Sequence, residues 1–128
     1  MTQEDKELIF KELCARLPYH VKCKIWIKDG TTEEGLLDLQ HNYGNVLQDA
    51  FYYNKIKDIK PYLFPLSSMT EEEKEEYCQL QQRVIYNSKG VINEDVTKYI
   101  NWCYKKHLDI NNLIPMELAI DATGLNIY

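Results

Sequence analysis

The sequence has little of what most enzyme classes require. Its five glycines are scattered and form no phosphate-binding loop. It contains no Gly-x-Ser-x-Gly motif, no His-Glu-x-x-His motif and no paired histidines. We therefore predict that the protein is not an enzyme and that it has no catalytic residues, no cofactor and no metal site.

Long apolar runs and a secretory leader are also missing. No apolar run reaches the roughly 18 residues that a membrane span needs, and the first ten residues, MTQEDKELIF, lack the basic start and apolar centre of a signal peptide. The four cysteines form no Cys-x-x-Cys motif: Cys14, Cys23, Cys78 and Cys103. We expect these thiols to be free and mostly buried in a reducing compartment. The prediction is a cytoplasmic protein with no membrane partner.

Basic residues are fewer than acidic residues in this chain. The chain has 15 basic and 20 acidic side chains, which give a net charge of −5. Nucleic-acid binders usually carry a basic excess because phosphate neutralisation dominates their affinity, so nucleic acid is a disfavoured partner unless a local patch attracts it. The chain is instead rich in tyrosine, with ten residues, and this side chain serves both cores and protein-binding surfaces. We therefore expect a protein partner.

The chain is organised around one segment, 55–73, which has strand-like sequence before it and helix-like sequence after it. Pro61 and Pro65 lack an N–H and fix φ, so neither is expected inside a central strand. Four large apolar residues of this segment are expected to join the two parts of the chain: Tyr62, Leu63, Phe64 and Leu66. We predict a single domain spanning all 128 residues. In it, a helical part (63–128) packs on a helix and small sheet (1–62).

The first half of the chain predicts a helix followed by short strands. Apolar residues recur at three- and four-residue steps over 3–17, with Thr2 as the cap. Over residues 20–28, aliphatic or cysteine side chains alternate with lysines, one histidine and one tryptophan, and this period of two predicts a strand. Asp29-Gly30 directly after it predicts a hairpin turn.

The strands that follow are less sharply marked. A second strand is expected over 31–40, with Gly35 suggesting a bulge or bend. A turn at 41–45, a third strand at 46–53, and a short fourth strand or single helical turn at 56–59 complete this half.

The second half of the chain predicts helices. Thr70 and Glu73 have the spacing of a capping box, and Asn93 is a second candidate cap. The predicted helical segments and docked tail are 71–86, 93–107, 113–120 and 122–128. The fold class is therefore α+β: an N-terminal helix, a small antiparallel sheet of three to four strands or a partly open barrel, then two to three helices and a docked C-terminal tail.

The polar face of the strand over 20–28 is the most informative surface. Its side chains are Lys22, Lys24, Trp26 and Lys28, and these are the candidate partner-binding residues. Lysines beside an aromatic ring on a strand resemble the stacking platforms that hold single-stranded nucleic acid. We favour the alternative, in which a helix or the tail covers Trp26 and the lysines form a rim. Glutamates at 33 and 34 could then neutralise those lysines across the hairpin.

Two other clusters have ordinary explanations. Cys103 and His107 are four residues apart on a predicted helix, which suits two metal ligands or a nucleophile and its base. No further ligand or orienting group accompanies them, so we expect a buried thiol near a histidine. The glutamate run at 71–76 could mimic a phosphate backbone, but a solvated helix face is the simpler interpretation.

Four strings carry a resemblance. They are KPYLFPLSSMT at 60–70, Leu-Pro-Tyr at 17–19, parts of 102–114, and Leu-Ala-Ile-Asp-Ala at 118–122. Together they resemble a family of short uncharacterised proteins from gut Bacteroides and their phages, although His20 stands where that family has a glycine. The resemblance implies a cytoplasmic setting and phage or mobile-element biology, with no activity, cofactor or catalytic residue attached.

These observations predict a non-enzymatic cytoplasmic protein-interaction module. Two alternatives remain. One is a nucleic-acid-associated protein that uses the Lys/Trp strand face, and the other is an acidic inhibitor of a host nucleic-acid-binding defence complex. Homo-oligomerisation through an open strand edge is also left open.

Overall fold

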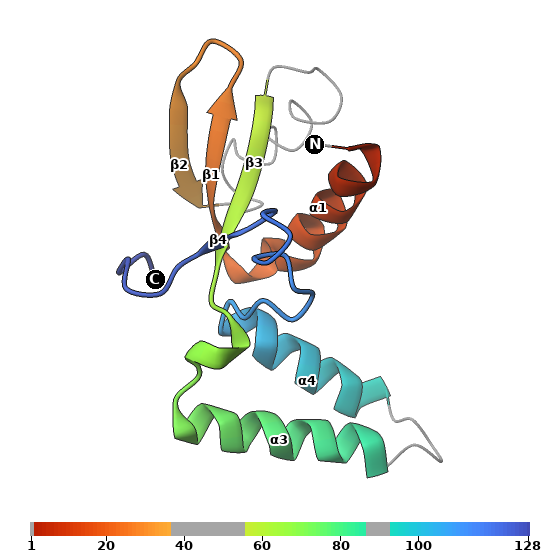
Figure 1. Ribbon diagram of the computed structural model, residues 1–128. Helices are drawn as coiled ribbons and strands as arrows, with labels where there is room; N and C mark the ends of the chain where they lie inside the picture. The colour runs from red at the N-terminus through yellow and green to blue at the C-terminus, as the bar shows by residue number, and fades with distance from the viewer. Residues whose placement is uncertain (1, 37–55, 87–92) are drawn as a thin grey trace.

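Figure 1 presents the computed structural model, which describes residues 2–36, 56–86 and 93–128. Its elements, in chain order, are α1 (Gln3–Arg16), η1 (Leu17–Tyr19), β1 (Lys22–Ile27), β2 (Thr32–Leu36), β3 (Ile56–Leu63), η2 (Leu66–Ser68), α3 (Glu71–Tyr86), α4 (Asn93–Lys105) and β4 (Ile120–Asp121). The predicted turn at 41–45 and the predicted third strand at 46–53 lie outside the described residues.

The four strands form one open sheet in the order β2-β1-β3-β4. The pairs β1–β2 and β1–β3 are antiparallel, whereas β4 joins β3 in parallel through Tyr62 and Leu63. The predicted α+β class, with an N-terminal helix, a small sheet and later helices, is confirmed. The sheet is mixed, however, and not purely antiparallel, because the chain returns to it from α4 by a long connection.

The core lies between α1 and one face of the sheet (Figure 1). The alternation predicted for β1 is confirmed, since Val21, Cys23 and Ile25 are buried and the residues between them are partly exposed. The core residues are Ile9, Leu13, Val21, Cys23, Ile25, Ile59, Leu63, Leu113, Leu118 and Ala119. They come from α1, both central strands and the segment after α4, so no single part of the chain closes the core alone.

Pro61 is the main correction to the sequence analysis. It lies inside β3, opposite Cys23 of β1, and is fully buried. One edge of β3 pairs with β1. Among the described residues, its other edge pairs with β4 only at Tyr62 and Leu63, so at Pro61 that edge has no strand partner. An edge of this kind tolerates a residue that cannot donate to the ladder. The short fourth strand predicted at 56–59 therefore continues through the proline to Leu63.

Two further predictions need correction. Gly35 pairs with Cys23 in an unbroken β1–β2 register, so it forms no bulge. Residues 113–120 form turns and the start of β4, not a helix. The left-handed backbone of Glu117 (φ 61°) interrupts any helix here, and the buried carboxylate of Asp109 fixes the start of the turn by accepting hydrogen bonds from the N–H groups of Leu113 (2.8 Å) and Ile114 (2.9 Å).

The helix starts were predicted correctly at two positions. Thr2 and Asp5 form a capping box at the start of α1. Thr70 Oγ1 accepts from the N–H of Glu73 (3.2 Å), and Glu73 Oε1 accepts from the N–H of Thr70 (3.0 Å), which makes the predicted box at α3. Helices α3 and α4 form a hairpin at the end of the molecule away from the β1–β2 turn (Figure 1).

Short backbone ladders join this helical hairpin to the sheet. Phe64 donates to His107 O and accepts from Asp109 N, both at 2.8 Å, directly after β3. The tail, defined here as residues 122–128, then docks on the sheet as predicted. Tyr128 Oη donates to Tyr62 O and accepts from Lys22 N, both at 2.8 Å. One tyrosine hydroxyl thus connects β1, β3 and the tail.

A buried ion pair ties α1 to the segment that follows α4. Arg16 is 0% exposed and Glu12 3%. Arg16 Nε donates to Glu12 Oε1 (2.6 Å), and Arg16 Nη2 donates to Leu108 O (2.6 Å). Asn111 donates to the second oxygen of Glu12 at 2.7 Å, and the guanidinium lies 4.6 Å from the Tyr104 ring centroid. Removing Arg16 or Glu12 leaves the other charge buried without its counter-charge.

We therefore expect Arg16→Met to lower the free energy of unfolding by about 3–5 kcal/mol, because it strands the Glu12 carboxylate in the core. The double variant Arg16→Met, Glu12→Leu should recover a large part of this loss. The matched control is Lys98→Met, which breaks the exposed Glu94–Lys98 pair (3.5 Å) of the same i,i+4 spacing and should cost less than about 1 kcal/mol. Urea denaturation measures all three, and equal losses for Arg16→Met and Lys98→Met would contradict the expectation.

Candidate functional site

The candidate site is the face of the sheet opposite the core. Successive side chains of a strand alternate between faces, so the burial of Cys23 and Ile25 places Lys22, Lys24 and Trp26 on the other side. All three are partly exposed. The structure therefore brings together three of the four residues that the sequence singled out.

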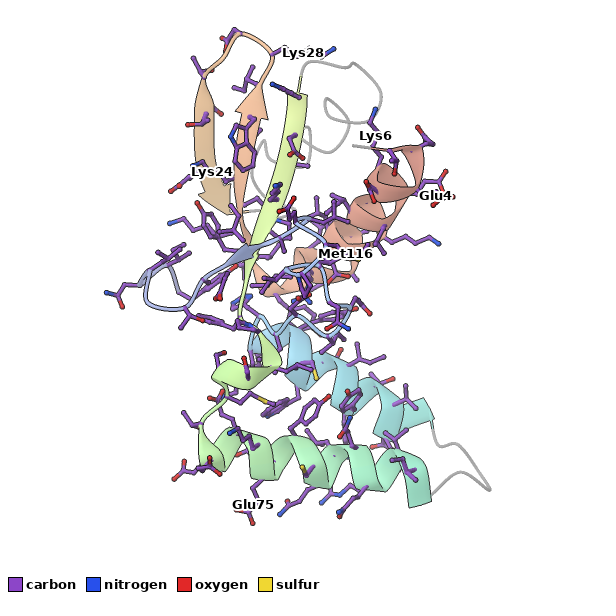
Figure 2. All side chains as sticks on the ribbon, viewed as in Figure 1. Glu4, Lys6, Lys24, Lys28, Glu75 and Met116 are labelled. Carbon is purple, nitrogen blue, oxygen red and sulfur yellow. The ribbon has the colours of Figure 1, made fainter. Side chains whose placement is uncertain are left out.

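The fourth residue, Lys28, does not belong to this cluster. It follows the end of β1 at Ile27, and Figure 2 shows it at the tip of the hairpin, well away from Lys24. The β1–β3 register also shifts between Trp26 and Ile27, which interrupts the regular alternation before Lys28 is reached. Lys28 is exposed in this position and does not belong to the site.

A lysine from β3 takes its place. Lys60 pairs directly with Lys24 in the β1–β3 register. The Lys24 and Lys60 ammonium nitrogens lie over the Trp26 ring, 5.3 and 5.6 Å from its centroid. These distances are within the range of cation–π attraction, which partly offsets the repulsion between the two ammonium groups. We call Lys22, Lys24, Trp26 and Lys60 the tryptophan–lysine face.

Sequence reasoning missed Lys60 because it needs the register between β1 and β3. Residues 28–55 separate these two strands in sequence. The available signal was the polar–apolar alternation of 58–60 around Ile59, which puts Lys60 on the side opposite the core.

Two carboxylates share this side of the sheet with the three lysines. Glu34 stands opposite Lys24 on β2, and Asp58 stands opposite Trp26 on β3. Glu34 Oε1 accepts a 2.6 Å hydrogen bond from Tyr62 Oη, and Asp58 Oδ1 accepts from the N–H of Ile59 at 2.8 Å. Both carboxylates are thus engaged in other bonds, and the face carries a small positive excess in a chain of net charge −5.

Trp26 is not covered by the tail. The tail reaches β1 only at Lys22, through Tyr128, and Trp26 is at the other end of the strand. Tyr62 is the buried residue on this side, and burial, together with its hydrogen bond to Glu34, raises its pKa to about 12. The prediction of a covered tryptophan with a lysine rim is therefore met only in part, because Trp26 stays half-buried under the lysine ammonium groups.

The Cys103–His107 pair does not have the geometry expected of it. Helix α4 ends at Lys105, and His107 adopts the left-handed conformation (φ 56°), so the two residues do not share a helix face. Burial raises the pKa of the Cys103 thiol to about 11. Burial lowers the pKa of His107 to about 4, and the positive charge of Arg16 adds to this effect. A protonated thiol beside a neutral imidazole is the opposite of an activated nucleophile.

His107 has a structural contact instead. Its ring stacks on Tyr128 with centroids 3.7 Å apart and an interplanar angle of 12°, and its Nδ1 is buried without a hydrogen-bond partner. Among the described residues, no group of three or more His, Cys, Asp and Glu side chains is placed to hold a metal ion. Two of the four cysteines, Cys14 and Cys78, are exposed, so the expectation of mostly buried thiols is half right.

The glutamate run forms the first turns of α3. Figure 2 shows Glu75 on the side of α3 that points away from α4. Glu73 faces the other way and lies 3.8 Å from Lys106, and Glu76 accepts a 2.9 Å hydrogen bond from Trp102 Nε1. Part of the run therefore holds the helical hairpin together, and the rest is solvated as expected.

Comparisons with family models, curated proteins and solved structures found no match to this chain. Over the ranges that the structure describes, no helix has the length and apolar character needed to cross a bilayer.

The His107 environment predicts a pH-dependent stability. An unfolded chain takes up the histidine proton near pH 6.5, whereas the folded state does so only near pH 4. Between these values the unfolded state binds more protons, so the free energy of unfolding falls as the pH is lowered, by about 2–3 kcal/mol.

The variant His107→Asn should flatten this part of the pH profile, since asparagine tolerates the left-handed backbone and does not titrate. His20→Asn is the control for the backbone change, because His20 has the same φ of 56° and is exposed; its charge makes the smallest contribution to the lowered pKa of His107, so most of the slope should remain. Thermal or urea unfolding from pH 7.5 to 4 measures the slopes. If the profile of His107→Asn falls as steeply as that of His20→Asn, His107 is not the group responsible.

Proposed function

We propose that this chain is a non-enzymatic, cytoplasmic interaction protein that binds an acidic segment of a partner protein through the tryptophan–lysine face. The observation that carries the proposal is the position of the Lys24 and Lys60 ammonium groups, 5.3 and 5.6 Å from the Trp26 ring centroid. Two cations held beside a partly exposed aromatic ring offer a charged and an apolar contact at one place.

Several properties of the face favour a carboxylate-bearing protein. A tryptophan at the centre of a small patch is a typical energetic hot spot, and charges at its rim set the partner and the rate of association. The local positive excess stands out against the acidic remainder of the chain, which repels other acidic surfaces elsewhere. The β-sheet backbone beneath the patch keeps Lys22, Lys24 and Trp26 in fixed register.

Single-stranded nucleic acid is the second candidate. The observation that favours it is the same ring with its flanking lysines, which resembles a base-stacking platform. The two ammonium groups already lie over the ring, so a base must displace them in order to stack. The two carboxylates on this side, Glu34 and Asp58, would also lie near the phosphates. We therefore rank this candidate below an acidic protein segment.

The third candidate is an acidic inhibitor of a host defence complex, which would use the exposed glutamates of α3. Its support is the resemblance to short Bacteroides and phage proteins together with the solvated side of α3. Glu73 and Glu76 bond within the helical hairpin, which leaves fewer carboxylates to imitate a phosphate backbone.

The proposal predicts that affinity purification from a host lysate captures a protein that is lost with Lys24→Glu, Lys60→Glu and with Trp26→Ala. Reversing two charges on the face should weaken that complex at least tenfold, because like charges then meet at the contact. The matched control is Lys11→Glu, Lys105→Glu, which makes the same charge change at exposed lysines of α1 and α4. Circular dichroism shows whether each variant keeps the fold.

Retention of the captured protein by both face variants would overturn the proposal. Titration with a fluorescent single-stranded oligonucleotide at two salt concentrations separates the second candidate. Binding that weakens steeply with salt and requires Trp26 would assign the face to nucleic acid. Reversal of the exposed glutamates 71, 72 and 75 to lysine tests the third candidate in the same capture experiment.

A further inference from the structure

A pocket of about 270 Å³ lies where the sheet meets the helical hairpin. It is formed by the residue after β3, by η2, by the start of α3, by the end of α4 with the residues that follow, and by the tail. Its lining residues are Phe64, Ser68, Met69, Glu73, Lys106, Leu108, Thr123 and Gly124. Three stretches far apart in sequence thus converge on it, which is typical of a ligand site at a junction of substructures.

The walls of the pocket divide into an apolar part and a charged part. Phe64, Met69 and Leu108 supply the apolar surface. Glu73 Oε2 and Lys106 Nζ lie 3.8 Å apart at the polar part, near the limit for an ion pair. Opposite charges at this separation attract each other only weakly, because both side chains are partly exposed.

The two charges are nevertheless held in place by neighbours. Glu73 Oε1 accepts the hydrogen bond of the α3 capping box from Thr70 N, which leaves Oε2 directed to Lys106. Lys106 Nζ lies 5.9 Å from the centroid of the Trp102 ring, and Trp102 is fixed in turn by its hydrogen bond to Glu76. Such supporting contacts reduce the entropy that a ligand must remove on binding.

We propose that this pocket binds a free α-amino acid with an apolar side chain, such as leucine or phenylalanine. The ligand carboxylate pairs with Lys106, the ligand ammonium pairs with Glu73, and the side chain packs on Phe64, Met69 and Leu108. The volume of about 270 Å³ is slightly below the range of pockets for drug-sized ligands. It suits a small zwitterion.

The charge pattern separates this ligand from simpler ones. An apolar monocarboxylate could pair with Lys106, but its charge would lie close to Glu73, and Glu73 would then have no cation of the ligand to pair with. An apolar amine would meet Lys106 in the same way. A phosphate-bearing ligand would bring still more negative charge to Glu73. Only a ligand with both charges on neighbouring atoms complements both groups at once.

The test is a titration of the ¹⁵N-labelled protein with L-leucine and L-phenylalanine, followed by NMR. Saturable shifts are expected at the backbone amides of Ser68, Thr123 and Gly124. Two analogues of leucine each lack one charge: 4-methylpentanoate has no ammonium group, and 3-methylbutylamine has no carboxylate. Each should bind at least tenfold more weakly than leucine.

Matched variants test the two charged residues. Lys106→Gln and Glu73→Gln should each weaken leucine binding at least tenfold, and glutamine at 73 can still complete the capping box. The controls are Lys105→Gln and Glu72→Gln, which remove the same charges from exposed neighbours and should leave binding unchanged.

Three results would overturn the inference: no saturable shift with either amino acid, binding of an analogue as tight as that of leucine, or unchanged binding in Lys106→Gln and Glu73→Gln. The outcome is independent of the proposed function, since neither Lys24 nor Lys60 lines the pocket and the variant Lys24→Glu, Lys60→Glu should bind leucine as the wild type does.

Discussion

The fold depends on a guanidinium group that has been removed from water. Arg16 is fully buried and bonds to Glu12 on its own helix and to the carbonyl of Leu108, 92 residues later. Burying two charges is costly unless their hydrogen bonds are made, and here one nitrogen, Nη1, has no partner in the described structure. Such a pair adds less to stability than its short distances suggest. Its hydrogen bonds instead fix where α1 lies relative to the segment after α4.

The same region controls the electrostatics of its neighbours. The positive charge of Arg16 keeps a second positive charge away, which is part of the reason for the lowered pKa of His107. The neutral ring can then stack on Tyr128, whose hydroxyl joins β1 to β3. A helix residue, a loop residue and a tail residue therefore hold the lower end of the sheet in one arrangement.

Local features were predictable from the sequence, and features that depend on pairing were not. The cap at Thr2, the capping box at Thr70, the alternation of β1 and the Asp29-Gly30 turn are set by neighbouring residues, and they were identified correctly. Pro61 was misjudged because the cost of a missing N–H depends on which edge of β3 has a partner. Lys60 was missed at the candidate site because the register between β1 and β3 pairs residues that are far apart in sequence. The turn after α4 was taken for a helix because the residue type of Glu117 gives no sign of the left-handed conformation that it adopts in the fold.

The parallel pairing of β3 with β4 has a consequence for synthesis. A ribosome must make about 60 residues after Leu63 before the strand that pairs with it exists, and loop closure over such a distance is slow. Until then the apolar face of the sheet formed by β1 and β3 lacks three core residues that pack on it in the finished fold: Leu113, Leu118 and Ala119. During translation this surface is a natural client for a chaperone, and the last strand to emerge ends that exposure.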